Sequence, residues 1–383
     1  MNRQLYRLAI SYFLTGFILW YAIEILFIES IGIDEFELAV SSAVFLSILV
    51  VFDVPSGVLA DKWSRKYTLI SSILLLSIAT IVIGSATGFM QYLLGAILFA
   101  FHEVLLSGTA QAIIYDTLAE QKRQREYSKV IGQMNAIFLA GVVISSLLGG
   151  LIGEYFSLST VFAVSALVCI VNLINILFIY EPAHIRPVVE NGYVKHVRQI
   201  ISLVTRNPAI ASAILLYVFS ILVAGIQYDF NHFYLIALGY GSLALGVANA
   251  FLSGSEALGS LIAHRVDKKQ LIYLAFIIAL ISIVFPFIRM PIVAVAPLLI
   301  LLVVRAVIEN KTETLIQDSL TTDIRATGIS VAGTLANIVT IPIFLAFGYI
   351  ANAYSIFTAF CIFGVLLTGI ALYIALNRKY EKL

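Results

Sequence analysis

Apolar runs about 20 residues long recur from one end of this chain to the other. Each run can cross the hydrocarbon core of a bilayer as a helix, and none shows the alternation that a membrane-spanning strand needs. The runs therefore predict an all-α polytopic membrane protein with twelve transmembrane helices. Their approximate bounds are 5–28, 38–60, 67–87, 90–118, 130–153, 160–180, 208–236, 243–264, 270–288, 292–318, 327–350 and 356–377.

The composition excludes an ordinary soluble domain. Of the 383 residues, 61% are hydrophobic and 12% are charged, whereas a soluble domain carries roughly 25% charged residues. The expected partner is therefore the lipid bilayer of a cell membrane, plasma or inner. The formal net charge of +1 gives no reason to expect a nucleic-acid partner. The first run is too long, and too closely followed by others, for a cleaved signal peptide.

The distribution of Lys and Arg sets the expected orientation. If the N-terminus is cytoplasmic, all but three of the 23 Lys and Arg residues fall on the inner side, as the positive-inside rule requires. The exceptions are Arg289 in an outer loop and Arg305 and Lys311 in the tenth span. The outer loops instead carry acidic residues, namely Glu29, Asp34, Glu35, Glu37 and Glu154. We therefore expect both termini in the cytoplasm.

One connection is much longer than the others. Residues 181–207 separate the sixth and seventh spans, and proline and glycine interrupt the first half of this segment. We therefore predict an N-terminal bundle of six helices at 1–180, a cytoplasmic linker at 181–207 and a C-terminal bundle of six helices at 208–383.

The two predicted halves resemble each other in sequence. A shift of 202 positions pairs Asp116 with Asp318 and Arg123 with Arg325 without a gap. Because most of the matching residues are polar, hydrophobic bias alone does not explain them. We predict two pseudo-symmetric six-helix bundles, related by an axis along the membrane normal.

The turn after the second span carries a charged motif, GVLADKWSRK, at residues 57–66. It resembles the loop-two signature of the major facilitator superfamily, roughly G-x-L-A-D-[RK]-x-G-R-[RK], with Ser64 where the family usually has Gly. The resemblance covers essentially the whole chain and implies the fold of that family. The matching residues are Gly57, Leu59, Ala60, Asp61, Lys62, Arg65 and Lys66.

The resemblance also implies a role for this motif. Gly57, Asp61, Arg65 and Lys66 would form a gating motif, in which Asp61 docks against the positive N-terminal end of the eleventh helix. Such a contact between an anion and a helix dipole stabilises by about 0.3–1 kcal/mol when it is exposed. Gly57 removes a side chain where two helices approach closely. The alternative interpretation is that the turn only fixes the topology.

Polar residues inside the spans are costly in hydrocarbon and therefore face protein or water. Several recur at intervals of four residues on the fourth and tenth spans, and others lie on the first and seventh. In the family that this chain resembles, these four helices line a central cavity. The resulting candidates for the substrate cavity are Trp20, Tyr21, Glu103, Ser107, Gln111, Gln227, Asn231, Arg305, Glu309 and Glu313.

Each of these candidates has a purely structural alternative. Arg305 and Glu309 could form an intrahelical pair, or Arg305 could instead bridge to Glu103 in the other half. The aromatic residues of the first span could pack in the bundle instead of contacting a substrate. An intramembrane carboxylate can also carry a proton. The candidates for proton coupling are Glu24, Asp53, Asp229 and Glu256.

For three of these carboxylates another role stays open. Glu24 could simply be exposed at the outer mouth. Asp53 and Glu256 occupy equivalent places on the second and eighth spans, where a gate or an interhelix contact is the rival interpretation.

The sequence gives little support for an enzyme. It contains no G-x-x-x-x-G-K-[ST], H-E-x-x-H or G-x-S-x-G pattern. The five His residues lack metal-ligand spacing, and the two Cys residues indicate no disulfide framework. We therefore expect a protein that is not an enzyme and that needs no cofactor or metal. We also expect a monomer.

Three functions remain open. The first is proton-coupled export of an amphipathic or cationic small molecule, and the second is proton-coupled uptake of a small polar or zwitterionic nutrient. The third, a receptor that transports nothing, is disfavoured because the gating motif is intact. The fifth span keeps Gly141, Gly149 and Gly150 but lacks the Gly-Pro step typical of drug–proton antiporters in this family. The expected partners are a small-molecule substrate and protons.

Overall fold

The computed structural model describes residues 3–182, 200, 202–321, 325–377 and 379–382. These residues form two compact units, and each unit is described by itself. Unit 1 comprises 1–37, 41–187 and 240–253, and unit 2 comprises 38–40, 188–239 and 254–383. The described helices follow the expected spans, while the predicted boundary in the linker falls largely outside the described residues.

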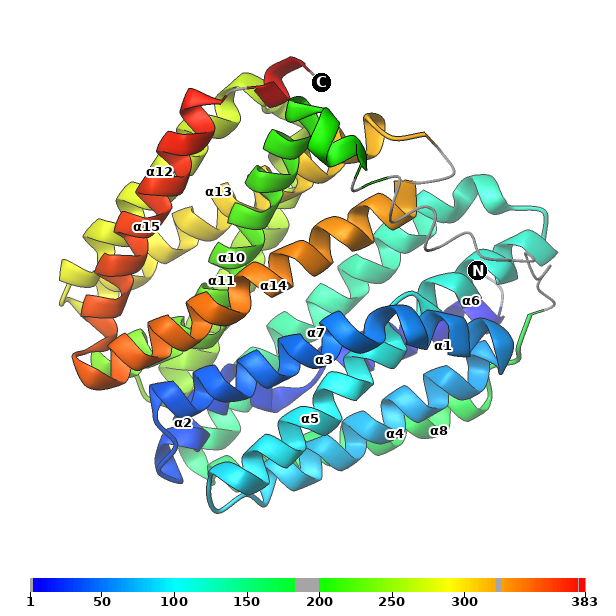
Figure 1. Ribbon diagram of the computed structural model, residues 1–383. Helices are drawn as coiled ribbons and strands as arrows, with labels where there is room; N and C mark the ends of the chain where they lie inside the picture. The colour runs from blue at the N-terminus through cyan, green and yellow to red at the C-terminus, as the bar shows by residue number, and fades with distance from the viewer. Residues whose placement is uncertain (1–2, 183–199, 201, 322–324, 378, 383) are drawn as a thin grey trace. The chain divides into compact units, whose positions relative to one another are not determined.

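Apart from residues 240–253, the helices of unit 1 come from the first half of the chain (Figure 1). They are α1 (Arg3–Gly16), η1 (Leu19–Ala22), α2 (Glu24–Ser30), α3 (Glu35–Lys62), α4 (Arg65–Gly84), α5 (Phe89–Leu106), α6 (Thr109–Glu120), η2 (Gln124–Glu126), α7 (Tyr127–Tyr155) and α8 (Leu158–Leu177). Helix α4 packs against α5 and α8, and α1 packs against α7.

The helices of unit 2 come from the second half. They are α10 (Pro208–Ala237), α12 (Leu271–Val284), α13 (Pro291–Asp318), α14 (Arg325–Ala353) and α15 (Ile356–Leu376). Helices α12 and α15 lie side by side, and α10 packs against α13 and α14 (Figure 1). At one end of α10, the carbonyl oxygens of Phe285 (3.0 Å) and Ile288 (2.9 Å) share the single hydrogen of the Tyr234 hydroxyl.

Helix α11 (Ser242–Ile262) is divided between the units. Its first part belongs to unit 1, and polar contacts join it to α7. The Asn249 side-chain amide donates to Ser146 Oγ (2.9 Å), and the Ser242 hydroxyl donates to the carbonyl oxygen of Gly150 (3.1 Å). The expected eighth span, 243–264, is therefore a helix.

The helices have the length and composition of membrane spans. Within the described residues, eleven helical segments are long and apolar enough to cross a bilayer. Helix α11 is the twelfth long helix and, with Asn249 and Glu256 in its sequence, it is not among those eleven. The prediction of an all-α polytopic membrane protein with about twelve helices is confirmed.

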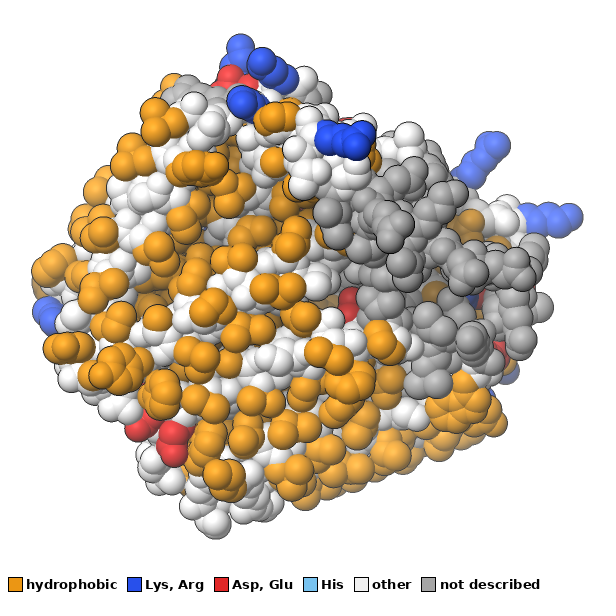
Figure 2. Space-filling view, in the orientation of Figure 1, with side chains coloured by type: hydrophobic (Ala, Val, Ile, Leu, Met, Phe, Trp, Pro, Cys, Tyr) orange, Lys and Arg blue, Asp and Glu red, His pale blue; other side chains and the backbone are white. Residues whose placement is uncertain are grey.

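The outward-facing side chains of these helices are apolar. Figure 2 shows hydrophobic side chains along the visible lengths of the helices, with Lys and Arg near helix ends. Leu167 on α8 and Leu280 on α12 are examples of large exposed aliphatic residues. Such surfaces are stable against lipid hydrocarbon and unstable against water.

The first span is not one continuous helix, which corrects the expected run at 5–28. Helix α1 ends at Gly16 and α2 begins at Glu24, with the short helix η1 between them. Side chains of neighbouring helices satisfy the backbone groups that the break releases. Ser145 donates its hydroxyl to the carbonyl oxygen of Gly16 (3.1 Å), and the amide of Leu19 donates to Ser165 Oγ (3.1 Å).

The fourth span is also interrupted, where a single helix at 90–118 was expected. Helix α5 ends at Leu106 and α6 begins at Thr109. Gly108 has a φ of 71°, in the left-handed region that glycine adopts readily. The corresponding spans of unit 2, α10 and α13, are continuous helices of 30 and 28 residues.

Glycines of α7 allow it to approach the broken first span closely. A Cβ atom on Gly141 would meet the carbonyl oxygen of Phe13, and one on Gly149 would overlap the carbonyl oxygen of Leu19. The glycines that the sequence retains in the fifth span therefore bring two backbones together.

We predict that Gly149→Ala destabilises the protein by about 1–3 kcal/mol, because the added methyl group must displace the backbone at Leu19. Gly132→Ala on the same helix is the matched control, since no atom lies within 4 Å of the added group. It should leave stability unchanged or raise it by up to about 1 kcal/mol. Thermal unfolding in detergent measures both, and equal midpoints would contradict the prediction.

Candidate functional site

An ion pair joins the start of α4 to α6 at the predicted inner end of unit 1. The Arg65 guanidinium donates to Asp116 Oδ2, and both side chains are largely buried. Glu181, just beyond α8, accepts from the Ser64 hydroxyl and from the Arg65 backbone amide (2.8 Å). We call these four residues, Ser64, Arg65, Asp116 and Glu181, the inner clamp.

The inner clamp also caps the N-terminus of α4, which begins within the charged motif. Ser64 is the N-cap residue, and its hydroxyl oxygen accepts from the amide of Tyr67 (3.2 Å). The Glu181 carboxylate lies at the positive end of the α4 dipole, where a negative charge is stabilised. The serine that departs from the family signature is therefore a helix cap in this chain.

The structure describes only part of the predicted gating motif. Arg65 lies in the inner clamp, and Lys66 is half-buried in the first turn of α4. The backbone of Gly57 and Asp61 belongs to α3, but the side chain of Asp61 lies outside the described part of the chain. The gating role of this motif therefore stays a prediction.

A second ionic group lies inside unit 2, between α11 and α13. Arg305 is only 7% exposed and donates to Glu256 Oε1 at 2.8 Å. Its guanidinium also donates to Glu309, one turn further along α13. We call Glu256, Arg305 and Glu309 the ion triad. The intrahelical pair was one of the expected alternatives, and the bond to Glu256 adds an interhelix contact.

The remaining acidic candidates differ in their surroundings. Glu313 accepts from the side-chain amide of Gln317 at 3.0 Å, one turn further along α13. Asp53 on α3 and Asp229 on α10 are both half-buried. Their assignment to proton coupling stays a prediction.

Helix α10 carries two buried amides one turn apart. Gln227 is 1% exposed and Asn231 is 2% exposed. Within the described residues, neither the side-chain oxygen nor the nitrogen of Gln227 has a hydrogen-bond partner, and the Asn231 side-chain oxygen also lacks one. Buried amide groups without partners are costly, so a polar ligand or water on this face would stabilise the structure.

The candidates on the first span lie in two elements. Trp20 and Tyr21 belong to η1, and Glu24 is the first residue of α2. Trp20 is fully buried, donates its indole N–H to Thr80 Oγ1 (3.3 Å) and stacks on Phe162. These contacts favour the packing alternative for Trp20, while Tyr21 is half-buried beside it. Glu24 accepts from the Tyr92 hydroxyl at 2.9 Å, so it lies against α5.

The three candidates of the fourth span lie on both sides of its interruption. Glu103 is in the last turn of α5, Ser107 is at the break, and Gln111 is in the first turn of α6. Ser107 and Gln111 are exposed, and the Glu103 side chain is 39% exposed. The break therefore disrupts the single polar face that the four-residue spacing predicts.

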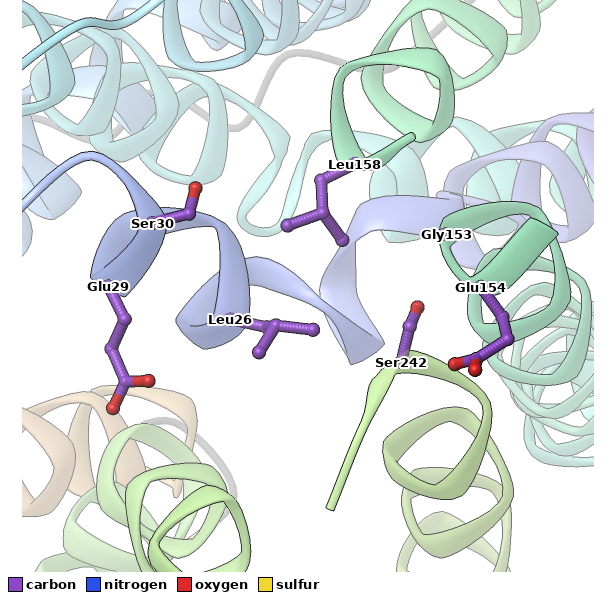
Figure 3. A pocket seen from close by; sticks show the side chains of 7 residues that line it. All are labelled: Leu26, Glu29, Ser30, Gly153, Glu154, Leu158 and Ser242. Atoms are coloured by element: carbon purple, nitrogen blue, oxygen red, sulfur yellow. The ribbon is translucent and has the colours of Figure 1, made fainter. Parts of the chain in front are cut away.

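An open pocket of about 520 Å³ lies at the predicted outer end of unit 1 (Figure 3). Glu29 and Glu154 stand on opposite sides of it, with Leu26, Ser30, Gly153, Leu158 and Ser242 completing the lining. Glu154 accepts from the backbone amide of Leu243 (3.3 Å) in the first turn of α11. Partial burial and the charge of Glu35 raise the pKa of Glu29 to about 7.

Within the described residues, no group of three or more His, Cys, Asp or Glu side chains is arranged to hold a metal ion.

These features define a polytopic helical membrane protein with charged groups held inside its helical units. The sequence pattern of the Major Facilitator Superfamily matches residues 6–342. The chain therefore belongs to the major facilitator superfamily, and it is a multi-pass membrane transporter, not an enzyme.

Curated relatives include transporters of several bacteria. The multidrug resistance protein MdtG of Salmonella dublin is 25% identical over 279 residues, which cover 68% of this chain and 66% of that protein. MdtG of Dickeya zeae is 30% identical over 233 residues, 58% of this chain and 54% of that protein. An uncharacterized transporter of Buchnera aphidicola is 26% identical over 147 residues, and the match spans 38% of this chain and 36% of that protein.

Solved structures share the fold. The nucleoside transporter NupG superposes with a TM-score of 0.83 at 15% identity, covering 98% of this chain and 100% of that one. A D-xylose-proton symporter gives a TM-score of 0.73 at 13% identity, covering 97% and 95%. At such identities the likeness concerns the fold alone.

Sequence reasoning missed several partners of the predicted residues. Asp116 pairs with Arg65, and Glu181 caps α4, although neither was assigned to the site. The pairing of Asp116 with Asp318 in the internal repeat was a usable signal for the first. For Glu181 no signal exists in the pattern, because the residue lies far from the motif in sequence.

We predict that Asp116→Ala destabilises the protein by about 1.5–3 kcal/mol, because the buried Arg65 guanidinium loses a charged acceptor. The matched control is Glu126→Ala, which removes the acceptor of Arg123 in a pair whose side chains are both more than a third exposed. The control should cost less than about 1 kcal/mol. Thermal unfolding in detergent compares the two variants. An equal loss of stability would contradict the prediction that the buried pair stabilises the protein more than the exposed one.

The raised pKa of Glu29 predicts a pH-dependent stability. The folded protein keeps this proton up to a higher pH than the unfolded chain, so stability falls as pH rises from about 4.5 to about 7. Glu29→Gln should remove this fall, by less than about 1 kcal/mol because the side chain is partly solvated. Unfolding midpoints measured across that range test this, and parallel curves for both proteins would contradict it.

Proposed function

We propose that this transporter exports an amphipathic or cationic small molecule in exchange for protons, by alternating access. The observation that carries the proposal is the balance of charge inside the spans. Arg305 is already shared by Glu256 and Glu309 in the ion triad. The spans also contain the carboxylates Glu24, Asp53 and Glu103, while Lys311 is the further cation in the tenth span, and protons or a cationic substrate can bind such carboxylates.

The relatives support the same direction of transport. Two of them are named multidrug resistance protein, which is consistent with export of a foreign compound. The proposed coupling is an exchange in which an intramembrane carboxylate releases its proton when the cation binds and takes up another when the cation leaves. The candidates for this role remain Glu24, Asp53, Asp229 and Glu256.

The proposed gate is the charged motif of residues 57–66 together with the inner clamp. Asp61 would dock against the eleventh helix in one state of the cycle, as the family resemblance implies. The inner clamp would hold α4, α6 and the segment after α8 as one rigid piece, so that the motif moves with the bundle. We also propose cytoplasmic termini and a monomer.

Uptake of a small polar nutrient is the second candidate. It is favoured by the buried amides of Gln227 and Asn231, whose unpartnered atoms could bind hydroxyl or amide groups of a neutral substrate. In that case protons and substrate would move in the same direction, and the carboxylates would carry protons alone.

Inside-out vesicles separate the two candidates. With an acidic interior, the exporter should accumulate the cationic dye ethidium in exchange for protons, and accumulation should stop when the pH gradient is collapsed. Vesicles without the protein are the control. No gradient-dependent accumulation of ethidium would contradict the proposed export, and proton-driven uptake of a nucleoside or sugar in right-side-out vesicles would establish the alternative.

Two substitutions test the assigned roles in that assay. Asp61→Asn should lower the rate of accumulation at least several-fold and leave ethidium binding unchanged, because it weakens a gate and not the cavity. Glu24→Gln should change the dependence on the pH gradient, because the variant side chain cannot release a proton. If both variants accumulate ethidium like the parent protein, the assignment of these residues is wrong.

A further inference from the structure

We propose that His102 and Glu103 on α5 form a proton-binding pair, in which one proton is shared between the imidazole and the carboxyl group. This inference rests on the proposed proton coupling and names a site for it outside the four candidates above. It changes the interpretation of Glu103, which sequence reasoning placed among the substrate contacts.

The first observation is the fixed orientation of the His102 ring. The ring is fully buried, and Nδ1 lies 2.9 Å from the carbonyl oxygen of Ser72 on α4 and 2.8 Å from the Ser72 hydroxyl oxygen. That hydroxyl donates its own hydrogen to the carbonyl oxygen of His102 (3.0 Å). A carbonyl oxygen can only accept, so Nδ1 carries the hydrogen and the Nε2 atom of the neutral ring has a free lone pair.

The second observation is what Nε2 faces. It lies 3.7 Å from Glu103 Oε1, and within the described residues it has no hydrogen-bond partner of its own. A neutral imidazole and an ionised carboxylate would therefore place two lone pairs opposite each other, and the imidazole nitrogen has no access to water. One proton removes this conflict, either on the carboxyl group or on Nε2, so the two residues titrate as one pair.

The third observation is access. The Glu103 side chain is 39% exposed while His102 is fully buried. A proton from water can reach the carboxylate first and then be shared with Nε2, and it leaves by the reverse route. No bond other than the one to this proton forms or breaks. The exposed carboxylate is also the part of the pair that a cationic substrate can reach, so the two cations compete for it.

The elements packed against α5 bring few other charges to the pair. Helix α3 contacts it through rings, with Phe45 beside Phe99 and Phe52 beside Phe101, and its nearby acidic residue is Asp53. The broken first span contributes Trp20 and Tyr21 beside Phe99, and Glu24 bound to Tyr92 at the other end of α5. On α4 the cations are Arg65 and Lys66 in its first turn. Helix α6, which also contacts α5, carries Asp116 and Glu120, and Asp116 is paired with Arg65.

The fourth observation is that Glu103 lies next to the interruption of the fourth span, where a change of charge can alter the backbone. The Glu103 carbonyl oxygen accepts from the amide of Ser107 (2.9 Å), which closes the last turn of α5 before the left-handed Gly108. A change of charge at Glu103 therefore acts at the only place where the fourth span departs from helical geometry within its described length. The corresponding span of unit 2 has Arg305 at the equivalent position, where the ion triad fixes it.

A proton count on the purified protein tests the pair without any substrate. Difference titration from about pH 5 to about pH 8, the range in which histidine normally changes charge, compares the parent protein with Glu103→Gln and with His102→Gln. We expect each variant to bind one proton fewer than the parent, and the double variant to lose the same single proton. If either single variant binds as many protons as the parent, or if the double variant loses two, the pair does not share a proton.

The matched control is His232→Gln. His232 on α10 is also a buried histidine whose Nε2 lacks a hydrogen-bond partner, but it makes no ion pair within the described residues. This variant should retain the shared proton. Nitrogen-15 spectra of labelled histidine provide a second readout, in which the resonance lost in His102→Gln should show a protonated Nδ1. A protonated Nε2 in the neutral ring would overturn the proposal.

Flux distinguishes the failure of this inference from the failure of the proposed function. In the ethidium assay, Glu103→Gln should abolish accumulation against a gradient and keep downhill exchange. If the variant still accumulates ethidium uphill, the pair is not the coupling site, although the export function stands. If the parent protein moves no ethidium and yet shows the shared proton, export fails while the proton pair stands.

Discussion

The bilayer offers no hydrogen bonds to a polypeptide backbone, and this constraint determines where the chain can be irregular. Helices satisfy their own backbone groups, so most of the chain is helical. The first span is interrupted between α1 and α2, where Ser145 and Ser165 supply the bonds that the break releases. The fourth span breaks at Ser107 and Gly108, beside the exposed end of Glu103. In unit 1 the candidate polar residues therefore lie beside irregular backbone, whereas in unit 2 the ion triad and the buried amides lie on continuous helices.

Because the bilayer core contains no water, charged side chains within the spans also need partners in the protein. In unit 2 one buried arginine is held by two carboxylates, so its charge is locally compensated. In unit 1 the inner clamp compensates Arg65 near the predicted membrane surface, whereas Glu24 accepts from the Tyr92 hydroxyl and Glu103 faces the His102 imidazole. The two halves thus share a repeat in sequence but differ in the arrangement of their described ionic groups, and the proposed proton exchange builds on this difference.

Much of this architecture follows from sequence, because apolar length and the distribution of Lys and Arg are direct consequences of the bilayer. The helices and the pair between Arg305 and Glu309 are examples. The breaks were missed because Gly16 and Ser107–Gly108 lie in runs that are apolar enough for continuous helices. The contacts of Ser72 with His102 and of Glu181 with Ser64 were missed because they join residues that are remote in sequence.

The central claim is that this transporter exchanges protons for a cation. The most direct measurement is the internal pH of liposomes that contain the protein, after ethidium is added outside with no imposed pH gradient. The account predicts that protons leave the liposomes as ethidium enters, with a rate that depends on the protein. Entry of ethidium through the protein without any proton movement, or with protons entering alongside it, would contradict the account.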